Sequence, residues 1–521
     1  KNFYVKLGLA NSNLKIKELK FQNFLNKGNN FFFNFKTNWF KNKNNQDYTF
    51  FEKKFSIGNV SRDYVTRDLI IFLKNYYSYI ELKKKRYDKI FISTKEIDCF
   101  KKFIDIKKKL FFYYNSNNKY SDFVDRDIET KFDYNLIKVK KYLFIFRFLQ
   151  NLIKSLLSSK LLIFNDPSLK FFFKKKNFLV FNSVNIFKSF YFIRQKRVKV
   201  NFPNNFDFKF KQNLERFNLP QEFIDIFSEH INKKLRKNLN LFNTYYLMIN
   251  EMLNFYKPKS IIIPSLKTFQ SMLVQYACIN KNINIILATD GSNMNIFNDI
   301  PFNKKTLKKN NVNIMTYSHE EKNFFKKIID VKNIKLSPLP VHLNFKNNFK
   351  KKYDLVILDY FWSFNNNSIK SKRDYSYKIL YDILSTVEKS KKKNIAIKFK
   401  KANSKTYFEY QEFVIKNILK KFSKLNINFL GDDFSEALNY SNIFVGGMST
   451  SVIETIYSKK KYIIYLPSEV GFEDSFINKF SIYIKSKQVV RNLSELKKKI
   501  NSKEKIKLKK KLNQFKLITL I

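Results

Sequence analysis

The chain is poor in the residues on which several protein classes depend. Its 521 residues include two cysteines and three histidines, which excludes a disulfide scaffold and a four-cysteine zinc module and argues against a histidine-rich metal enzyme. Eight glycines and nine prolines exclude collagen-like, mucin-like and linker-dominated chains. Hydrophobic residues nevertheless make up 44% of the chain, with 60 Phe and 30 Tyr, so large cores can form and global disorder is excluded.

Acidic residues are scarce as well. The chain has 43 Asp and Glu against 100 Lys and Arg, which gives a formal charge of +57. Lys, Asn, Phe, Ile and Tyr are abundant throughout, as AT-rich codons produce, and the lysine runs are scattered, so most lysines are expected on solvated surfaces. A field of this sign still favours anionic partners, namely an acidic membrane surface, nucleic acid or phosphate-bearing substrates.

Long uninterrupted apolar runs are also absent. The most apolar stretch covers 142–164, but Arg147, Lys154 and Lys160 interrupt it, whereas a membrane-spanning helix needs about 18–20 apolar residues. Its apolar residues recur three and four apart, which predicts a helix that packs in a core or lies on a membrane surface. The chain opens without a hydrophobic signal core, so we expect a cytoplasmic protein, with peripheral contact to the inner membrane face as the alternative that the charge suggests.

Turn residues become more frequent after about residue 250, and short apolar segments there alternate with helical patterns. Strands are predicted at 260–264, 284–288, 313–317, 354–358, 394–397, 426–430, 443–445 and 462–466. Helices are predicted at 268–280, 375–387, 408–422, 435–439 and 451–457. This alternation is typical of parallel sheets covered by helices on both faces. In the N-terminal half only a strand at 88–93 stands out.

The alternation also predicts the domain organisation. Pro338-Leu339-Pro340 breaks the pattern and is a candidate hinge. We therefore predict an N-terminal domain at 1–340, Rossmann-like over 255–335 and with insertions before it, and a C-terminal Rossmann-like domain at 341–521. The predicted fold class is α/β, with two doubly wound domains that face a cleft where their strand carboxyl ends point.

The most informative motif is Gly446-Gly447-Met448-Ser449-Thr450-Ser451, which connects a strand to a helix. The two glycines allow a tight turn and a close approach to a ligand, and the hydroxyls and amides at a helix start can bind a phosphate. A structural interpretation competes with this one: Ser451 caps the helix, and Glu454 three residues later completes a capping box. The two interpretations are compatible, because Ser449 and Thr450 remain available.

This motif, followed by Glu454 and then by Lys461–Pro467, resembles the C-terminal half of GT-B glycosyltransferases, the nucleotide-sugar enzymes that build bacterial surface and capsular polysaccharides. The resemblance covers about 255–470. It implies that the domain at 341–521 binds the nucleotide-sugar, with Gly446, Gly447, Ser449 and Thr450 on the donor phosphates and Glu454 on the ribose. The domain at 1–340 would then hold the acceptor.

The pair Asp290-Gly291 is similar to the acidic-Gly motif of bacterial sialyltransferases, whose carboxylate acts as general base on the acceptor hydroxyl. A partly buried carboxylate, with its raised pKa, suits that role. Equally, Asp290 can be a turn residue before a glycine. Those enzymes usually carry a His-Pro pair after the strand at 394–397, where this chain has Lys398-Phe399-Lys400 instead. Lysine can neutralise a leaving diphosphate as a point charge, or it can lie on a lysine-rich surface.

Other candidate residues for the cleft are His342, just past the hinge, and Asp359, which follows the strand at 354–358. No metal motif, P-loop or GxGxxG fingerprint is present, so no metal and no cofactor are predicted. We expect a metal-independent GT-B glycosyltransferase that moves a sugar from a nucleotide-sugar to a surface polysaccharide or lipid-linked glycan. The alternatives are a UDP-sugar 2-epimerase or polyol-phosphate transferase of the same fold, an inactive scaffold, and a polyanion-binding protein. Nucleic acid is the less favoured partner, because no RNA- or DNA-binding motif is visible.

Overall fold

The computed structural model describes about half of the chain. The described residues are 28–84, 90–93, 103, 111–114, 161–164, 178–181, 206–263, 269–287, 312–316, 322–323, 326, 334–336, 351–359, 372–399, 405–431, 434–447, 450–458, 460–467 and 489–502. They divide into two compact units: 1–124 with 198–243, and 125–197 with 244–521. The predicted boundary at residue 340 lies outside the described residues and stays a prediction.

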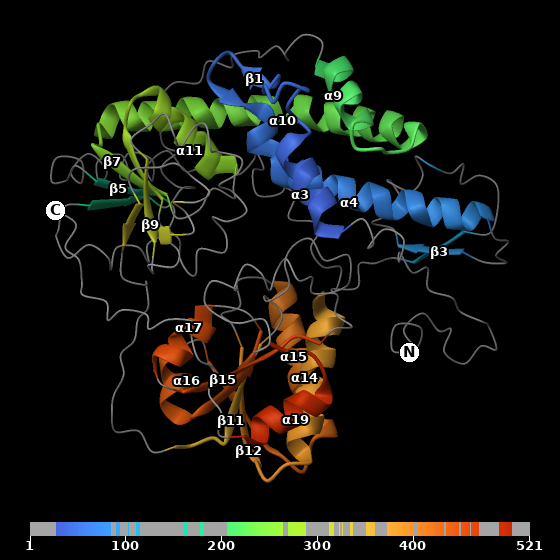
Figure 1. Ribbon diagram of the computed structural model, residues 1–521, viewed down its shortest axis with the longest axis vertical. Helices are drawn as coiled ribbons and strands as arrows, with labels where there is room; N and C mark the ends of the chain where they lie inside the picture. Colours follow the sequence, from blue (N-terminus) through green and yellow to red (C-terminus); the bar gives the residue numbers. More distant parts are fainter. Residues whose placement is uncertain are drawn as a thin grey trace, which may run out of the picture. The chain divides into compact units, whose positions relative to one another are not determined.

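The first unit is built on long helices (Figure 1). Its helices are α3 (Gly28–Asn38), α4 (Ile57–Lys84), α9 (Phe206–Glu215) and the first two thirds of α10 (Gln221–Tyr256). Aromatic rings fill its core: Phe72 lies 5.4 Å from Phe227, and Trp39 lies 5.4 Å from Phe210. Asp68 of α4 accepts hydrogen bonds from Lys234 and His230 of α10 at 2.9 and 3.3 Å. Apolar packing and this buried polar contact together join the two helices.

Short strands complete the first unit. β1 (Phe50–Phe51) and β2 (Phe55–Ser56) form an antiparallel hairpin, and β3 (Ile90–Ser93) pairs in parallel with β4 (Phe111–Tyr114). The strand predicted at 88–93 is therefore confirmed.

The second unit contains two six-stranded sheets in which every described pairing is parallel. One sheet has the order β10-β9-β8-β7-β5-β6. Its strands are β5 (Leu161–Phe164), β6 (Phe178–Phe181), β7 (Ser260–Ile263), β8 (Asn284–Leu287), β9 (Val312–Thr316) and β10 (Ile334–Leu336). α11 (Phe269–Asn280) connects β7 to β8 and buries Cys278, whose thiol pKa is raised by burial. Cys278 is therefore a core residue.

The other sheet, called the C-terminal sheet below, has the order β13-β12-β11-β14-β15-β16. Its strands are β11 (Leu355–Leu358), β12 (Asn394–Lys398), β13 (Asn426–Leu430), β14 (Ile443–Gly446), β15 (Lys461–Tyr465) and β16 (Val489–Val490). Helices α16 (Phe434–Tyr440) and α17 (Thr450–Tyr457) cover one face (Figure 1). Helices α14 (Lys372–Glu388), α15 (Lys405–Lys421) and α19 (Leu493–Asn501) cover the other. The predicted α/β class with two Rossmann-like parallel sheets is confirmed.

Apolar strand residues explain why this sheet is covered on both faces. All four residues of β11 are buried, and so are the last four of β12. A strand with apolar side chains on both faces has to be covered by helices on both sides. The predicted helix over the apolar stretch at 142–164 lies outside the described residues, except for its last four residues, which form β5.

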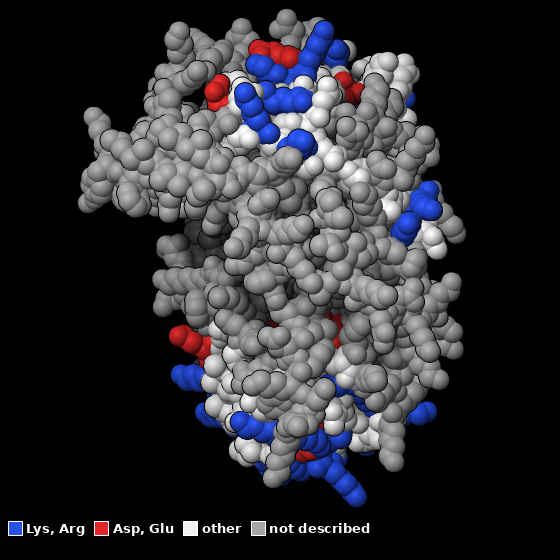
Figure 2. All heavy atoms as spheres, turned by 90° about the vertical axis from the view of Figure 1, so that its left-hand side faces the viewer, with Lys and Arg blue, Asp and Glu red and all other residues white. Residues whose placement is uncertain are grey.

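Lysine side chains are spread over the described surface. On the face shown in Figure 2, Lys and Arg side chains form several separate groups with Asp and Glu among them. Lys461 is an exception, because it is only 4% exposed and its ammonium donates to the carbonyl oxygens of Lys499 and Ser502 at the end of α19. A cation is stabilised there by the negative end of the helix dipole. Within the described residues, no helix is long and apolar enough to cross a membrane.

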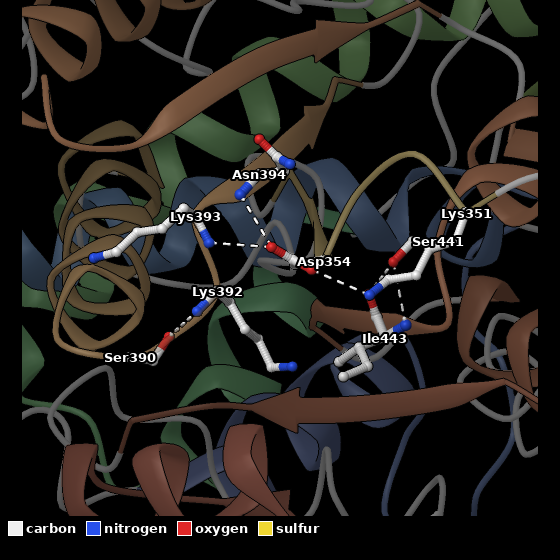
Figure 3. A network of polar contacts seen from close by, with 8 residues as sticks. All are labelled: Lys351, Asp354, Ser390, Lys392, Lys393, Asn394, Ser441 and Ile443. Atoms are coloured by element: carbon white, nitrogen blue, oxygen red, sulfur yellow. Dashed lines mark hydrogen bonds and ion pairs between the residues drawn. The ribbon is translucent and has the colours of Figure 1, made fainter.

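Asp354 organises the amino-terminal end of the C-terminal sheet (Figure 3). Its carboxylate accepts hydrogen bonds from the backbone N–H groups of Lys393 and Asn394 at 3.1 and 3.2 Å and from the Lys351 ammonium at 3.1 Å. Partial burial raises the pKa of Asp354, but these hydrogen bonds outweigh burial and lower it below its usual value. These hydrogen bonds join β11 to β12. Asp354 is not part of the candidate site, because ligands of such sheets bind at the carboxyl ends of the strands, at the opposite edge.

We expect Asp354→Ala to destabilise the fold by about 1–2 kcal/mol at neutral pH, because hydrogen bonds to a charged group are lost. The contribution of Asp354 is present above its unfolded pKa and is lost as the pH falls through its lowered folded pKa. Urea unfolding at pH 7 and pH 3 therefore tests the role. A difference between the two proteins that is as large at pH 3 as at pH 7 would contradict it.

Candidate functional site

The candidate site lies at the carboxyl edge of the C-terminal sheet, where β11 and β14 are neighbours. Counted along the chain, the six strands follow the order 3-2-1-4-5-6, which is the order of Rossmann folds. β11 and β14 are the pair at which this order reverses, so the chain leaves them toward opposite faces. Ligands of open α/β sheets bind outside the carboxyl ends of the strands at this switch point.

Gly446 and Gly447 end β14 in a tightly packed turn. A Cβ on Gly446 would meet the Tyr462 hydroxyl at 2.3 Å and the Leu358 Cβ at 3.1 Å. That hydroxyl in turn donates a buried hydrogen bond of 2.8 Å to the carbonyl oxygen of Gly447. Glycine suits position 446, because side-chain atoms of Tyr462 and Leu358 occupy the space that a Cβ would take. Tyr462 therefore fixes the position of the turn that leads to α17.

Helix α17 begins at Thr450, so the predicted capping role of Ser451 is wrong. Ser451 lies within the first turn, and its carbonyl oxygen accepts a hydrogen bond of 2.6 Å from the Thr455 hydroxyl. Helix α17 follows β14, one of the two strands at the switch point, and the first backbone N–H groups of a helix have no acceptor within it. Such groups, together with the helix dipole, form an anion-binding position.

Glu454 lies one turn further along α17 and is half-buried. Burial raises the pKa of its carboxyl group to about 7, although the positive charge of Lys398 acts in the opposite direction. At neutral pH the group therefore exists in both its protonated and ionised forms. A perturbed carboxyl group at a strand edge is a recognised indicator of functional sites.

Lys398 is the charged partner of Glu454 and ends β12. Its side chain is only 9% exposed, its ammonium donates to the Phe399 carbonyl oxygen at 3.0 Å, and it lies 6.0 Å from the Phe434 ring. The prediction of a surface lysine is wrong for this residue. A lysine held in a largely buried position near an aromatic ring can present its charge to an anion.

Asp359 joins the same edge through its backbone. Its N–H donates to the Lys398 carbonyl oxygen at 3.0 Å, directly after the β11–β12 register pair of Leu358 and Lys398. Asp359, Lys398, Gly446 and Gly447 thus belong to one edge of one sheet, and Glu454 lies on the helix that follows Gly447 along the chain. Carboxylates, an ammonium group and helix-start amides at one edge can bind a ligand that has both phosphates and hydroxyls.

The remaining predicted site residues lie wholly or partly outside the described part of the chain. Thr450 is the first residue of α17, but its side chain is not described. Asp290, Gly291, His342, Lys400 and Ser449 lie outside the described residues, so their roles stay predictions. The role of Tyr462 was not predicted. A tyrosine in an apolar strand gives no sign that its hydroxyl will donate to the carbonyl oxygen of a glycine 15 residues earlier. Among the described residues, no group of three or more His, Cys, Asp and Glu side chains is placed to hold a metal ion.

No protein-family model matches this chain, and no curated protein matches it. Among solved structures, it is similar to UDP-GlcNAc 2-epimerase from Neisseria meningitidis bound to UDP-GlcNAc, at 10% identity and a TM-score of 0.35 over 65% of this chain and 89% of that one. It is also similar to UDP-GlcNAc 2-epimerase from Methanocaldococcus jannaschii, at 13% identity and a TM-score of 0.36 over 67% and 94% of the two chains. Sucrose-phosphate synthase from Thermosynechococcus elongatus is similar at 9% identity, with a TM-score of 0.30 over 50% of this chain and 74% of that one.

Proposed function

We propose that this chain is a GT-B-type enzyme that uses a nucleotide-sugar, and specifically a glycosyltransferase. Its acceptor would be a surface polysaccharide or a lipid-linked glycan, reached from the cytoplasmic side of the membrane. The observation that carries the proposal is the position of the Gly446-Gly447 turn and Lys398 at the switch point of the C-terminal sheet, with Glu454 on the helix that follows. This edge combines an anion position with a carboxylate, as a nucleoside diphosphate requires.

The donor would bind with its phosphates over the start of α17. Gly446 and Gly447 supply close backbone approach, and Ser449 and Thr450 supply hydroxyls to the phosphate oxygens. The ionised Glu454 carboxylate accepts hydrogen bonds from the ribose hydroxyls. The Lys398 ammonium neutralises the charge that develops on the leaving nucleotide, because a fixed positive charge stabilises that charge more in the transition state than in the substrate.

The acceptor chemistry is assigned to Asp290. As a general base it would take the proton of the acceptor hydroxyl while the oxygen attacks the anomeric carbon and the nucleotide leaves. Gly291 allows close approach beside it, and Asp359, His342 and Lys400 are proposed to line the cleft. The nucleotide-sugar is the substrate in this scheme, and no cofactor or metal is assigned a role.

Thermal unfolding with UDP, CMP, CDP and GDP tests the donor site. At a hundredfold excess over its Kd, one nucleotide should stabilise the wild-type protein by about 2.7 kcal/mol. The Ser449→Ala, Thr450→Ala double variant should lose this stabilisation, because it removes the phosphate hydroxyls. The matched control is Ser458→Ala, since Ser458 lies past the other end of α17 and donates to the Glu454 carbonyl oxygen at 2.7 Å.

The identity of the stabilising nucleotide distinguishes the alternatives. CMP would favour a sialyltransferase-like enzyme, and UDP would favour the other nucleotide-sugar enzymes. Incubation with UDP-GlcNAc alone then separates a transferase, which needs an acceptor, from a 2-epimerase, which converts the sugar without one. No stabilisation by any nucleotide would contradict the proposal and favour an inactive scaffold or a polyanion-binding protein.

A further inference from the structure

Tyr462 of β15 points to the face of the C-terminal sheet that α16 and α17 cover. The preceding residue, Lys461, reaches the opposite face, where its ammonium donates to the Lys499 carbonyl oxygen of α19. Successive side chains of a strand alternate between the two faces, so Tyr462 points toward α16 and α17 (Figure 1). Its side chain is buried there, with 1% of its surface exposed.

The Tyr462 side chain extends along β14 to the turn that ends this strand. In the register of β14 and β15, Tyr462 lies opposite Phe444, but its hydroxyl donates to the carbonyl oxygen of Gly447, further along the chain, at 2.8 Å. The hydroxyl also lies 2.3 Å from the position that a Cβ on Gly446 would take. A side chain at position 446 would therefore displace the hydroxyl from its bond to Gly447.

Lys398 shares this face of the sheet with the turn. Leu358 pairs with Lys398 in the register of β11 and β12, and its Cβ lies 3.1 Å from the position that a Cβ on Gly446 would take. The Lys398 ammonium lies 6.0 Å from the ring of Phe434, which belongs to α16 on the same face. Residues that pair across neighbouring strands point to one face of a sheet. The Lys398 charge and the turn that Tyr462 contacts therefore lie on one face, at one edge.

The direction of the Gly447 carbonyl group matters for an anion at this edge. A peptide carbonyl carries partial negative charge on its oxygen, so an oxygen that faced a phosphate would repel it. The hydrogen bond from Tyr462 is buried, so the Gly447 oxygen faces the protein interior. The edge is then left to groups of positive polarity, namely the first N–H groups of α17 and the Lys398 ammonium.

We propose that Tyr462 is a positioning residue for the donor phosphates, because its hydroxyl holds the Gly447 carbonyl group away from them. This inference rests on the donor site proposed above, over the start of α17. Without the hydroxyl, the Gly447 oxygen loses this buried donor, and the turn rotates the oxygen toward water, where the phosphates bind. Glycine has the backbone freedom for that rotation. Tyr462 thus acts on the phosphates and not on the base of the donor.

Titration calorimetry of the full chain tests this role. The probes are inorganic diphosphate and the nucleotides UDP, CMP, CDP and GDP, each measured beside its nucleoside. In Tyr462→Phe, the Kd for diphosphate and for the nucleotide that stabilises the wild type should rise about tenfold, because a repelling oxygen turns toward the phosphates. The Kd for the nucleoside should not change. A purely structural role would change the Kd for nucleotide and nucleoside alike.

A second variant displaces the same hydroxyl in another way. Gly446→Ala should show the same selective loss of phosphate affinity, since its methyl group would lie where the hydroxyl lies. Two controls lie at the opposite edge of the sheet. Asp354→Ala removes hydrogen bonds there, and Tyr353→Phe removes the hydroxyl of a tyrosine that is 4% exposed. Both controls should bind diphosphate and nucleotide like the wild type.

Three results would overturn the role of Tyr462. They are wild-type diphosphate affinity in folded Tyr462→Phe, an equal loss of nucleoside affinity, and an equal loss of phosphate affinity in Asp354→Ala. A wild-type protein that binds neither diphosphate nor any of the nucleotides would contradict the donor site itself. Wild-type binding that Tyr462→Phe leaves unchanged would contradict only the role of Tyr462, so the two failures are distinguishable.

Discussion

Glu454→Gln should stabilise the folded protein at pH 8 by about 2–3 kcal/mol and should have little effect at pH 4. The reason is the pKa of about 7 that burial gives this carboxyl group, against an ordinary value of 4.5. Each unit of difference between the folded and unfolded pKa corresponds to about 1.4 kcal/mol of folding free energy. Imperfect hydrogen bonding of the new amide reduces the expected gain in stability. Glu454 is proposed to bind the ribose. A residue that serves function often lowers stability, so its replacement is expected to stabilise the fold.

The sign of this effect follows from proton linkage. Below about pH 4.5 the carboxyl group is protonated in both the folded and unfolded protein, so it does not change stability. Between about pH 4.5 and pH 7 the folded state retains a proton that the unfolded state has lost, so wild-type stability falls as the pH rises. Above that window the full penalty for the buried charge is present.

Urea unfolding of both proteins from pH 4 to pH 8 measures this difference. Glu412→Gln is the matched control, because Glu412 is exposed on α15, and it should not change the pH dependence. A Glu454→Gln variant that is less stable than wild type at pH 8 would contradict the burial argument. If Glu454 binds the ribose as proposed, the same variant should also bind the stabilising nucleotide more weakly, because an amide replaces the carboxylate.

Gly446→Ala should destabilise the fold by about 3 kcal/mol. The new methyl group would lie 2.3 Å from the Tyr462 hydroxyl and 3.1 Å from the Leu358 Cβ, so the buried Tyr462 side chain would have to shift. Overpacking of this kind usually costs about 1–3 kcal/mol, and here it also disturbs the hydrogen bond from Tyr462 to Gly447. Denaturant unfolding measures the loss.

Two further variants show whether the clash is the cause. Gly431→Ala is the control, because no atom lies within 4 Å of the position that its Cβ would take, and its stability should stay within about 0.5 kcal/mol of wild type. Tyr462→Phe removes the nearest atom, so in the double variant with Gly446→Ala the two effects should be less than additive by about 1 kcal/mol or more. Simple additivity would show that the packing argument is wrong.

The strands of both sheets were predictable because their sequences are short apolar runs bounded by turn residues. The predicted strand at 426–430 coincides with β13, and the one at 443–445 differs from β14 by one residue. The long helices of the first unit were missed, although α10 carries Phe223, Phe227, Ile231 and Leu235 at intervals of four residues. Lysine and asparagine between the apolar positions obscured that signal, although Pro220 directly precedes the helix and Pro258 follows two residues after its end.

The candidate site was predictable only in part. The glycines at 446 and 447 and the acidic residue at 454 follow from local sequence, because a strand that enters a helix through glycines is a local pattern. The cap at Ser451 was wrong, since the helix already begins at Thr450, and the contact of Tyr462 with Gly446 was not predicted. Local sequence contains no information about that contact.

By itself, the sequence determined that the second unit is an α/β structure with parallel sheets and which glycines end β14. The pattern of apolar residues sets these features, because burial on one or both faces acts on neighbouring residues along the chain. Only the tertiary structure decided that Lys398 is buried and that burial raises the pKa of Glu454 to about 7. A side chain's charge state depends on the solvent and charges that surround it in space, and strands distant in sequence supply those surroundings.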